Sequence, residues 1–401
     1  MKPKIFIALQ VVIDQGGISA SIQNLLHEIH EKYDVTLCAV GGYISPHAEI
    51  PSDVRIIDGS PLIRDAITDR KLLKNQNFIQ RLYRNGIRLL RRYVGMPFIV
   101  RWGVRQIAVP NMEYDAAVAF SNDIYDCEQL SVGGVYDLVL SIPAKRKVAW
   151  MHNDLRKEGY TRKIALQAFR NFDAIVTVSF ENKSLIDEMV PEYREKTYVG
   201  YNTYNIERIK ELSLADNPYT QNGKLHFVTV ARLQITQKRQ DRIIKACGKL
   251  KEEGFTNFEW YLVGEGELET LKEMAEKLNV QDIVHFTGIK NNPYPYMRYA
   301  DAFVLTSQYE GLGMTVKEAQ IVGCPTFITE FGPAHEAVID GKQGKICENS
   351  TEGVYEMVKE LIQHPAQLDS YRQYIKENPV SNDLALQQFC EACNLCKEDQ
   401  R

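Results

Sequence analysis

Two glutamates, Glu310 and Glu318, have the spacing in this chain that most clearly suggests chemistry. Seven residues separate them, and both follow the apolar run Ala302–Leu305. An apolar run, a glycine-rich turn and then a helix is an arrangement in which a helix N-terminus can face an anion. Glu310 falls in the turn. Glu318 follows about two helical turns later, near the same face.

Two carboxylates with backbone amides between them suit a ligand that has hydroxyl groups on both sides of a phosphate. We expect one carboxylate to contact the sugar of a bound nucleotide sugar and the other its ribose. The amides of the intervening turn would meet the phosphates. These amides belong to Gly311, Leu312, Gly313 and Met314. On spacing alone, a turn acid followed by a solvated helical glutamate is an equally good interpretation.

Two cations are expected close to the carboxyl end of another strand. Arg232 and Lys238 lie between the apolar run His226–Val230 and a helical pattern. Cations in this position can neutralise a departing diphosphate, a task that many enzymes give to Mg²⁺. The chain has no Asp-x-Asp motif, so we expect neither a metal nor a cofactor. Surface cations in an ordinary loop are the alternative.

Gly16 and Gly17 follow the first apolar run and open a helix. Glycines there let a ligand approach the backbone at a helix N-terminus. The full G-x-G-x-x-G fingerprint is missing, and no acid in a fitting position ends the second strand, so a nicotinamide cofactor is disfavoured. By itself a Gly-Gly turn is more often structural.

The bulk properties are those of a soluble protein with two domains. The chain has 401 residues, a net charge of -4 and eight cysteines. No apolar run is long enough to cross a membrane, and the N-terminus favours a first strand over a signal peptide. Most of the cysteines are isolated, which fits reduced thiols in the cytoplasm. Cys390, Cys393 and Cys396 have the spacing of successive helical turns, and a metal site there is the less favoured interpretation.

Short apolar runs alternate with helical patterns, which predicts an α/β protein with parallel sheets. We expect two Rossmann-like domains with a cleft between them, and ligands at the carboxyl ends of the strands. The domains are placed at residues 1–205 and 206–370. A helical segment, 371–401, is expected to return to the first domain. Residues 197–221 look like a linker. The predicted strands are Ile5–Leu9, Val35–Val40, Ala116–Phe120, Lys147–Trp150, Ala174–Val178, His226–Val230, Trp260–Val263, Ile283–Phe286, Ala302–Leu305 and Thr326–Thr329.

The order of these motifs resembles the family 4 glycosyltransferases of GT-B fold. The likeness is strong over residues 220–350 and looser before them. Its residues are the Gly-Gly turn, Arg232, Lys238, Val263-Gly-Glu-Gly266, Phe286-Thr-Gly288, Ser307 to Gly313, Glu318-Ala and Gly323-Cys-Pro325. The resemblance implies transfer of a sugar from a nucleotide diphosphate, with retention of anomeric configuration and without a catalytic metal.

The same resemblance implies roles for single residues. Arg232 and Lys238 would hold the diphosphate, Glu318 would bind the ribose hydroxyls, and Glu310 would contact the donor sugar. Gly16 and Gly17 would approach the diphosphate from the first domain. His152 resembles the family's histidine close to the transferred sugar, although such a histidine is otherwise more often structural.

Two departures from the family pattern affect the cationic loop. Arg232 and Lys238 stand one residue further apart than is usual, and Arg239 occupies a position where glycine often follows the lysine. Arg239 is therefore a candidate to share the phosphate role.

Residues 70–112 contain ten Lys or Arg residues and no Asp or Glu. A helix here would have an arginine stripe opposite a Tyr, Leu and Ile face, which suits an anionic membrane surface. The stripe consists of Arg81, Arg84, Arg88, Arg91 and Arg92. An ordinary helix with solvated arginines is the alternative. Nucleic acid is disfavoured, because the chain is acidic and has no nucleic-acid-binding module.

We therefore expect a metal-independent, hexosyltransferase-type glycosyltransferase of polysaccharide biosynthesis. UDP-sugar is the favoured donor, and the acceptor is a glycan or is carried on a lipid. The protein would lie in the cytoplasm, peripherally associated with the inner face of the plasma membrane. The alternatives are a nucleotide-sugar epimerase or hydrolase of GT-B fold and a non-catalytic partner subunit. The sequence leaves the oligomeric state open.

Overall fold

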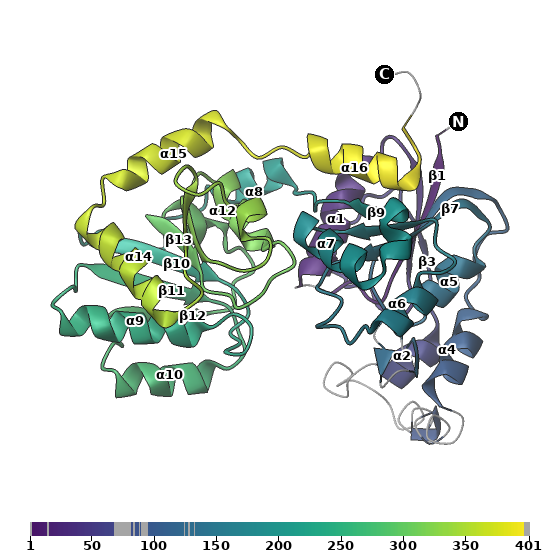
Figure 1. Ribbon diagram of the computed structural model, residues 1–401, viewed down its shortest axis with the longest axis horizontal. Coiled ribbons are helices and arrows are strands. Elements are labelled where there is room, and N and C mark those ends of the chain that lie inside the picture. Colours follow the sequence, from purple (N-terminus) through teal and green to yellow (C-terminus); the bar gives the residue numbers. More distant parts are fainter. Residues whose placement is uncertain are drawn as a thin grey trace. The chain divides into compact units, whose positions relative to one another are not determined.

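The computed structural model describes residues 2–13, 16–67, 82, 85–87, 89, 95–123, 125–126, 129–131 and 133–396. The chain divides into two compact units. The first is Met1–Tyr204 with Asn382–Arg401, and the second is Asn205–Ser381. Residues 371–381, predicted to return to the first domain, belong to the second unit. Both units consist of helices packed on a parallel sheet (Figure 1).

The described residues of the first unit contain a seven-stranded sheet in the order β3-β2-β1-β4-β7-β8-β9, with every pairing parallel. Its strands are β1 (Lys4–Leu9), β2 (Asp34–Ala39), β3 (Arg55–Ile57), β4 (Tyr114–Ala119), β7 (Ala144–Met151), β8 (Ala174–Thr177) and β9 (Thr197–Val199). A separate antiparallel pair joins β5 (Tyr125–Asp126) to β6 (Gln129–Ser131). The helices are α1 (Gly17–Ile29), α2 (Pro61–Ile67), α4 (Met96–Val104), α5 (Val135–Ser141), α6 (Arg162–Ala168), α7 (Phe180–Met189), the 3₁₀ helix η2 (Pro191–Lys196) and α16 (Asp383–Cys393).

This sheet is buried on both faces because its strands are apolar at consecutive positions. Successive residues of β1 enter opposite clusters: Phe6 packs with α4, α5 and α6, whereas Ile5 and Ile7 pack with α1 and α16. The C-terminal helix α16 contributes Phe389 to the second of these clusters. Residues 382–396 thus complete the core of the first unit.

The described residues of the second unit contain a six-stranded parallel sheet in the order β12-β11-β10-β13-β14-β15. Its strands are β10 (Leu225–Val230), β11 (Phe258–Val263), β12 (Val284–Gly288), β13 (Ala302–Leu305), β14 (Thr326–Thr329) and β15 (Gly344–Cys347). The helices are α8 (Ile206–Leu212), α9 (Gln240–Glu252), α10 (Leu268–Lys277), α11 (Tyr294–Arg298), α12 (Met314–Ile321), α13 (Ala334–Ala337), α14 (Thr351–Gln363) and α15 (Gln367–Glu377).

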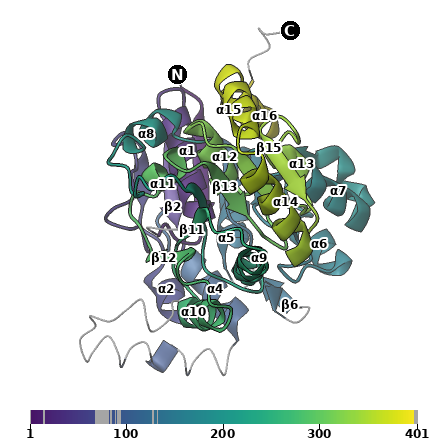
Figure 2. The same cartoon turned by 90° about the vertical axis from the view of Figure 1, so that its left-hand side faces the viewer.

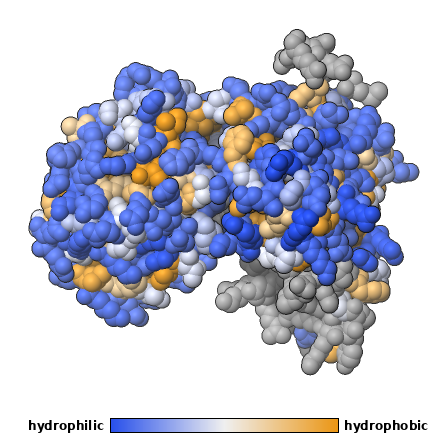
Figure 3. Space-filling view, in the orientation of Figure 1, coloured by the Kyte–Doolittle hydropathy of each residue, from blue (hydrophilic) through white to orange (hydrophobic). Residues whose placement is uncertain are grey.

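Helices α9, α10 and α14 lie side by side over one face of this sheet (Figures 1 and 2). Trp260, Phe227 and Phe258 are fully buried under these helices. On the other face, α11 packs on β10, and α12 packs on β13 and β14. The surface drawn in Figure 3 is predominantly hydrophilic. None of the described helices is long and apolar enough to cross a membrane.

The predicted fold class, α/β with two Rossmann-like domains, is confirmed, and each of the ten predicted strands overlaps an observed one. The segment 197–221, predicted to be a linker, contains the boundary between the two units, which falls after Tyr204. The segment also contains β9, which extends the first sheet, and α8, which packs in the second unit. Strands β3, β5, β6, β9 and β15 were not predicted. Each contains at most two consecutive apolar residues, too few to form a recognisable apolar run.

Candidate functional site in the second unit

Strand order brings two predicted motifs to the same point of the second sheet. Strands β10 and β13 are neighbours, with Phe227 paired to Ala302, although two other strands separate them in the sequence. Later strands are therefore added outward on both sides of this pair, β11 and β12 beside β10 and β14 and β15 beside β13. In open parallel sheets, ligands bind beyond the carboxyl ends of the strands at such a switch point. Arg232 and Lys238 follow β10, and Glu310 follows β13.

The loop that carries Arg232 lies directly against the turn after β11. A Cβ atom on Gly264 would lie 2.0 Å from the carbonyl oxygen of Ala231, and one on Gly266 would lie 2.1 Å from that of Leu233. Leu233 N–H donates to Glu265 O at 2.7 Å and so joins the two backbones. The two glycines are needed for this close approach. Their role here is to support the cationic loop.

A turn accommodates the wide spacing between Arg232 and Lys238, which is one residue more than the family pattern implies. Lys238 N–H donates to Gln234 O at 2.8 Å and closes the turn. Buried Gln240 then ties the turn to the helix, because its Oε1 accepts from Gln234 N–H at 3.1 Å and its Nε2 donates to Arg232 O at 2.8 Å. The side chain of Arg232 is exposed and makes no hydrogen bond or ion pair with any residue that the structure describes.

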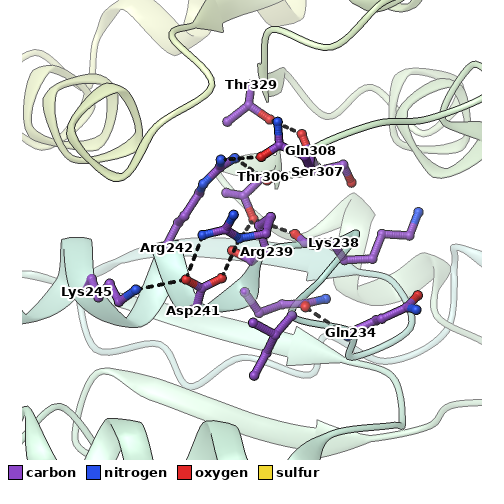
Figure 4. Close-up of polar contacts among 12 residues, drawn as sticks. Gln234, Lys238, Arg239, Asp241, Arg242, Lys245, Thr306, Ser307, Gln308 and Thr329 are labelled. Carbon is purple, nitrogen blue, oxygen red and sulfur yellow. Dashed lines mark hydrogen bonds and ion pairs between the residues drawn. The ribbon is translucent and has the colours of Figure 1, made fainter.

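Arg239 occupies the left-handed region, with φ of +54°, where glycine is favoured. A glycine would adopt this conformation without strain, so arginine is the less favoured residue here. The Arg239 guanidinium is bound to Asp241 through Nε at 2.9 Å and through a second nitrogen at 3.1 Å (Figure 4). Lys245 Nζ donates to the same carboxylate at 2.9 Å. Arg239 is therefore held by an acid of its own helix.

The structure brings Lys238 and Glu310 together as an ion pair. Lys238 Nζ donates to Glu310 Oε1, and the same oxygen accepts from Ser307 Oγ at 2.6 Å. The pair is largely removed from water, with side-chain exposures of 17% and 8%. Thr306 Oγ1 also donates to the backbone oxygens of Lys238 and Arg239, at 2.9 and 3.1 Å. The loops after β10 and β13 therefore hold each other through side chains and backbone.

The turn that follows Glu310 presents free amides. Gly313 has a φ of +79° and immediately precedes α12. The backbone N–H groups of Gly311, Leu312, Gly313 and Met314 donate no hydrogen bond to any described residue. Unpaired N–H groups at a helix start carry partial positive charge. This turn can therefore bind an anion.

Glu318 lies in the second turn of α12 and differs from Glu310 in its surroundings. Its half-buried carboxylate makes no hydrogen bond or ion pair with the described residues. Burial raises the pKa of Glu318 to about 7. A carboxylate that is withdrawn from water without a partner has unused capacity to accept hydrogen bonds. The neighbouring Lys317 is also half-buried, and burial lowers its pKa to about 8.

The other predicted site residues, Gly16, Gly17 and His152, belong to the first unit. Gly16 has a φ of +145°, which only glycine adopts readily, and α1 begins at Gly17. His152 directly follows β7 and is 7% exposed. Its Nε2 lies 2.8 Å from the carbonyl oxygen of Phe120, which follows β4. These residues lie at the carboxyl ends of the strands of the first sheet.

The contact with Phe120 determines the tautomer of His152. A carbonyl oxygen only accepts hydrogen bonds, so the Nε2 atom of His152 must carry the proton. Burial lowers the pKa of this imidazole to about 4. The ring is therefore neutral at physiological pH, and Nδ1 is left as a hydrogen-bond acceptor.

The described residues contain no group of three His, Cys, Asp or Glu side chains that could hold a metal ion. Cys390, Cys393 and Cys396 are at the end of α16 with free thiols. Cys390 Sγ lies 3.1 Å from the hydroxyl of Tyr33, and Cys393 is buried in the core of the first unit. The first two of these cysteines therefore pack against the first unit.

Sequence reasoning missed two residues beneath the site, Arg242 and Asn349. Arg242 is 4% exposed and hydrogen-bonds to the loops after β13 and β15. Asn349 donates to Glu330 O at 2.6 Å and to Ser307 O at 3.3 Å. The one available signal was an arginine directly before two apolar residues at the start of a helix. Asn349 belongs to no motif.

Comparison with known proteins relates the second unit to a known family. Residues 216–378 match the family model of the glycosyl transferases group 1. An uncharacterized glycosyltransferase of Methanocaldococcus jannaschii is 29% identical over 193 residues, which are 46% of this chain and 48% of the relative. The N-acetylgalactosamine-N,N'-diacetylbacillosaminyl-diphospho-undecaprenol 4-alpha-N-acetylgalactosaminyltransferase of Campylobacter jejuni is 24% identical over 208 residues, 50% of this chain and 55% of the relative. The chain thus spans about half the length of these curated relatives.

Solved structures extend the likeness in fold to the whole chain. The crystal structure of HepE from Anabaena in complex with UDP has a TM-score of 0.66 and 15% sequence identity. The match covers 99% of this chain and 100% of the HepE chain. At this identity, the likeness establishes the fold.

We predict that His152 stays neutral from pH 8 down to about pH 5, because burial disfavours the imidazolium. The unfolded chain binds a proton near pH 6.5, so the contribution of His152 to folding stability decreases as the pH falls from there toward 4. Imidazole ¹⁵N shifts, assigned by comparison with a His152→Gln variant, should report an Nε2–H tautomer over that range. A signal that titrates near pH 6.5 would contradict the prediction.

Proposed function

We propose that the chain transfers a sugar from a nucleotide diphosphate sugar, on the premise that residues 216–378 match the family model of the glycosyl transferases group 1. The single observation that carries the proposal is the Lys238–Glu310 pair beside the free amides of the Gly311–Met314 turn. The proposed class is a hexosyltransferase that retains anomeric configuration and does not need a metal.

The ion pair prepares both partners for the donor. A largely buried charge that loses its partner is destabilised by about 3–5 kcal/mol, so Lys238 and Glu310 will each exchange partners rather than become unpaired. A diphosphate oxygen replaces Glu310 on the ammonium of Lys238. Glu310 then accepts a hydrogen bond from a hydroxyl of the donor sugar while it keeps Ser307. Engagement of the phosphate and recognition of the sugar are thereby linked.

Glu318 supplies the ribose contact in this proposal. An ionised carboxylate accepts hydrogen bonds from two adjacent hydroxyl groups, and Glu318 has no competing partner among the described residues. Its pKa of about 7 means that both forms are populated at neutral pH, and ionisation strengthens the contact with the ribose. The exposed Arg232 is available to the same diphosphate.

The proposed reaction breaks the bond between the anomeric carbon and the phosphate oxygen and joins the carbon to an acceptor hydroxyl oxygen. The acceptor proton passes to the departing phosphate oxygen, so the products are a nucleoside diphosphate and a glycoside. Negative charge grows on the diphosphate, where Lys238, Arg232 and the free amides stabilise it. In the first unit, neutral His152 offers its Nδ1 as a hydrogen-bond acceptor.

We further propose UDP-sugar as the donor and a lipid-linked or polysaccharide acceptor. Two comparisons support this choice: HepE was solved with UDP, and the name of the Campylobacter relative contains a diphospho-undecaprenol acceptor. An epimerase, a hydrolase or a non-catalytic subunit is not favoured, because the family and these relatives are glycosyltransferases.

Action at the inner surface of the plasma membrane is part of the proposal. The predicted arginine stripe, Arg81 to Arg92, lies outside the described residues. Helix α4, within the same basic segment, is described. It exposes Phe98 by 57% and Trp102 by 47%, with Arg101 and Arg105 beside them. These four residues follow helical spacing, so they share one face. Aromatic and cationic groups on one exposed face suit an anionic lipid surface.

Lys238→Ala and Glu318→Ala should each lower sugar transfer by at least about a hundredfold, because each removes a group that binds the donor as charge develops. The assay offers UDP-sugars with lipid-linked and oligosaccharide acceptors and identifies the products by mass spectrometry. Lys249→Ala and Glu269→Ala are the controls, since both side chains lie on helices away from the site. Near-normal transfer by both site variants would refute the assignment.

We expect the protein to float with phosphatidylglycerol vesicles at low salt and not with phosphatidylcholine vesicles. Phe98→Ala combined with Trp102→Ala should remove at least about half of the bound protein, because buried aromatic area and lipid charge add in such binding. Phe180→Ala is the matched control, since that side chain is 56% exposed on α7. Vesicle binding that is absent, or that is unchanged in the double variant, would contradict the proposed membrane face.

A further inference from the structure

Arg242 is a buried cation without an acidic partner. It lies in the first turn of α9 and is 4% exposed. Its four hydrogen bonds go to neutral oxygens, which are Thr306 O at 3.2 Å, Gln308 Oε1 at 2.7 Å, Asn349 O at 3.0 Å, and Asn349 Oδ1. No ion pair joins Arg242 to a carboxylate within the described part of the chain. Burial of a charged group without a charged partner costs free energy. The contacts that the Arg242 guanidinium makes in this position therefore imply a role.

The acceptors of Arg242 lie on two different loops, which its guanidinium joins. Thr306 and Gln308 follow β13, and Asn349 follows β15, with β14 between these strands in the sheet. Figure 4 shows the guanidinium of Arg242 directed at Gln308, close to Thr306. A planar fork with five donors can hold several acceptors at once, whereas a lysine ammonium is a single point. Arginine is therefore the residue type that can join these two loops.

Two short paths of hydrogen bonds connect Arg242 with the segment that carries Lys238. Thr306, whose carbonyl accepts from Arg242, donates its Oγ1 to the backbone oxygen of Lys238 at 2.9 Å. Gln308, whose side chain accepts from Arg242, donates its N–H to Gln237 O at 2.7 Å. Both paths end in the turn that presents Lys238. Displacement of Arg242 would therefore move Lys238 without touching it.

We infer that Arg242 is a positioning residue for the diphosphate site, which acts by holding the Lys238 turn against the loop after β13. Asn349 is its partner in this role, because its Oδ1 and carbonyl oxygen bind the guanidinium while its Nδ2 binds Glu330 O and Ser307 O. The inference rests on the proposed function in that it takes the ligand to be a nucleoside diphosphate. Arg242 itself does not contact the nucleotide in the proposed site.

The test measures UDP binding by calorimetry in the full chain. Absence of UDP binding by the wild type would overturn both the proposed UDP site and the role of Arg242 that rests on it, whereas the outcomes below concern Arg242 alone. If the wild type binds UDP, Arg242→Lys should weaken binding about tenfold, because the charge is kept while the fork is lost. Asn349→Ala should have a similar effect. Lys249→Gln, on the same helix but bonded to Glu352, should change binding less than about twofold.

A double-mutant cycle separates positioning from general damage. In a Lys238→Ala background the Arg242→Lys substitution should cost less than about twofold, since the group that it positions is gone. Thermal unfolding identifies variants that do not fold, and Asn349→Ala supplies the cycle if Arg242→Lys is one of them. Unchanged UDP binding in Arg242→Lys and Asn349→Ala, or the same tenfold loss with and without Lys238, would overturn the inference.

Discussion

The second unit depends on how the carbonyl groups at the end of β13 are satisfied. Beyond Leu305 the chain leaves the sheet, and its backbone oxygens no longer have strand partners. Side chains from three other segments supply donors to Thr306 O and Ser307 O: Arg242 of α9, Asn349 after β15 and Thr329 of β14. A buried carbonyl without a donor would be costly. The hydrogen bonds that satisfy these carbonyl groups also hold the loop that carries Glu310 in place.

The same requirement explains why opposite charges can be kept close together with little access to water. With both loops held in place, Lys238 and Glu310 form an ion pair, and each of the two side chains is less than one fifth exposed. Arg239 is likewise bound by Asp241. Glu318 and the amides of the preceding turn are different, because they have no partner among the described residues. The unit thus combines paired charges with unused acceptors and donors, a combination that suits a polar, anionic ligand.

Much of this arrangement could be predicted from the sequence, for identifiable physical reasons. Buried parallel strands are continuous apolar runs, so the strands that form the middle of each sheet were visible. The glycine-rich turn before Glu318 was visible because a helix start after a strand has a local signature. The short β9, Thr197–Val199, was hidden because its residues become a strand only by pairing with β8.

Single-residue contacts were harder to predict. Nothing local indicates that Arg239 adopts a left-handed conformation or that Arg242 is buried. Both facts depend on the loop after β13, about 65 residues further along the chain. The pairing of Lys238 with Glu310 is likewise not apparent from the sequence, because the two residues are 72 positions apart. Long-range hydrogen bonds determine all three.

The central claim is that Lys238, in the loop between β10 and α9, binds the diphosphate of a nucleotide. The most direct measurement compares the affinities of UDP and UMP for the wild type and for Lys238→Ala by calorimetric titration. The wild type should prefer UDP by at least about tenfold, because a charge-assisted contact to the second phosphate contributes about 1.5–3 kcal/mol. This preference should disappear in Lys238→Ala. Equal affinity for the two nucleotides in the wild type, or an undiminished preference in the variant, would contradict the central claim.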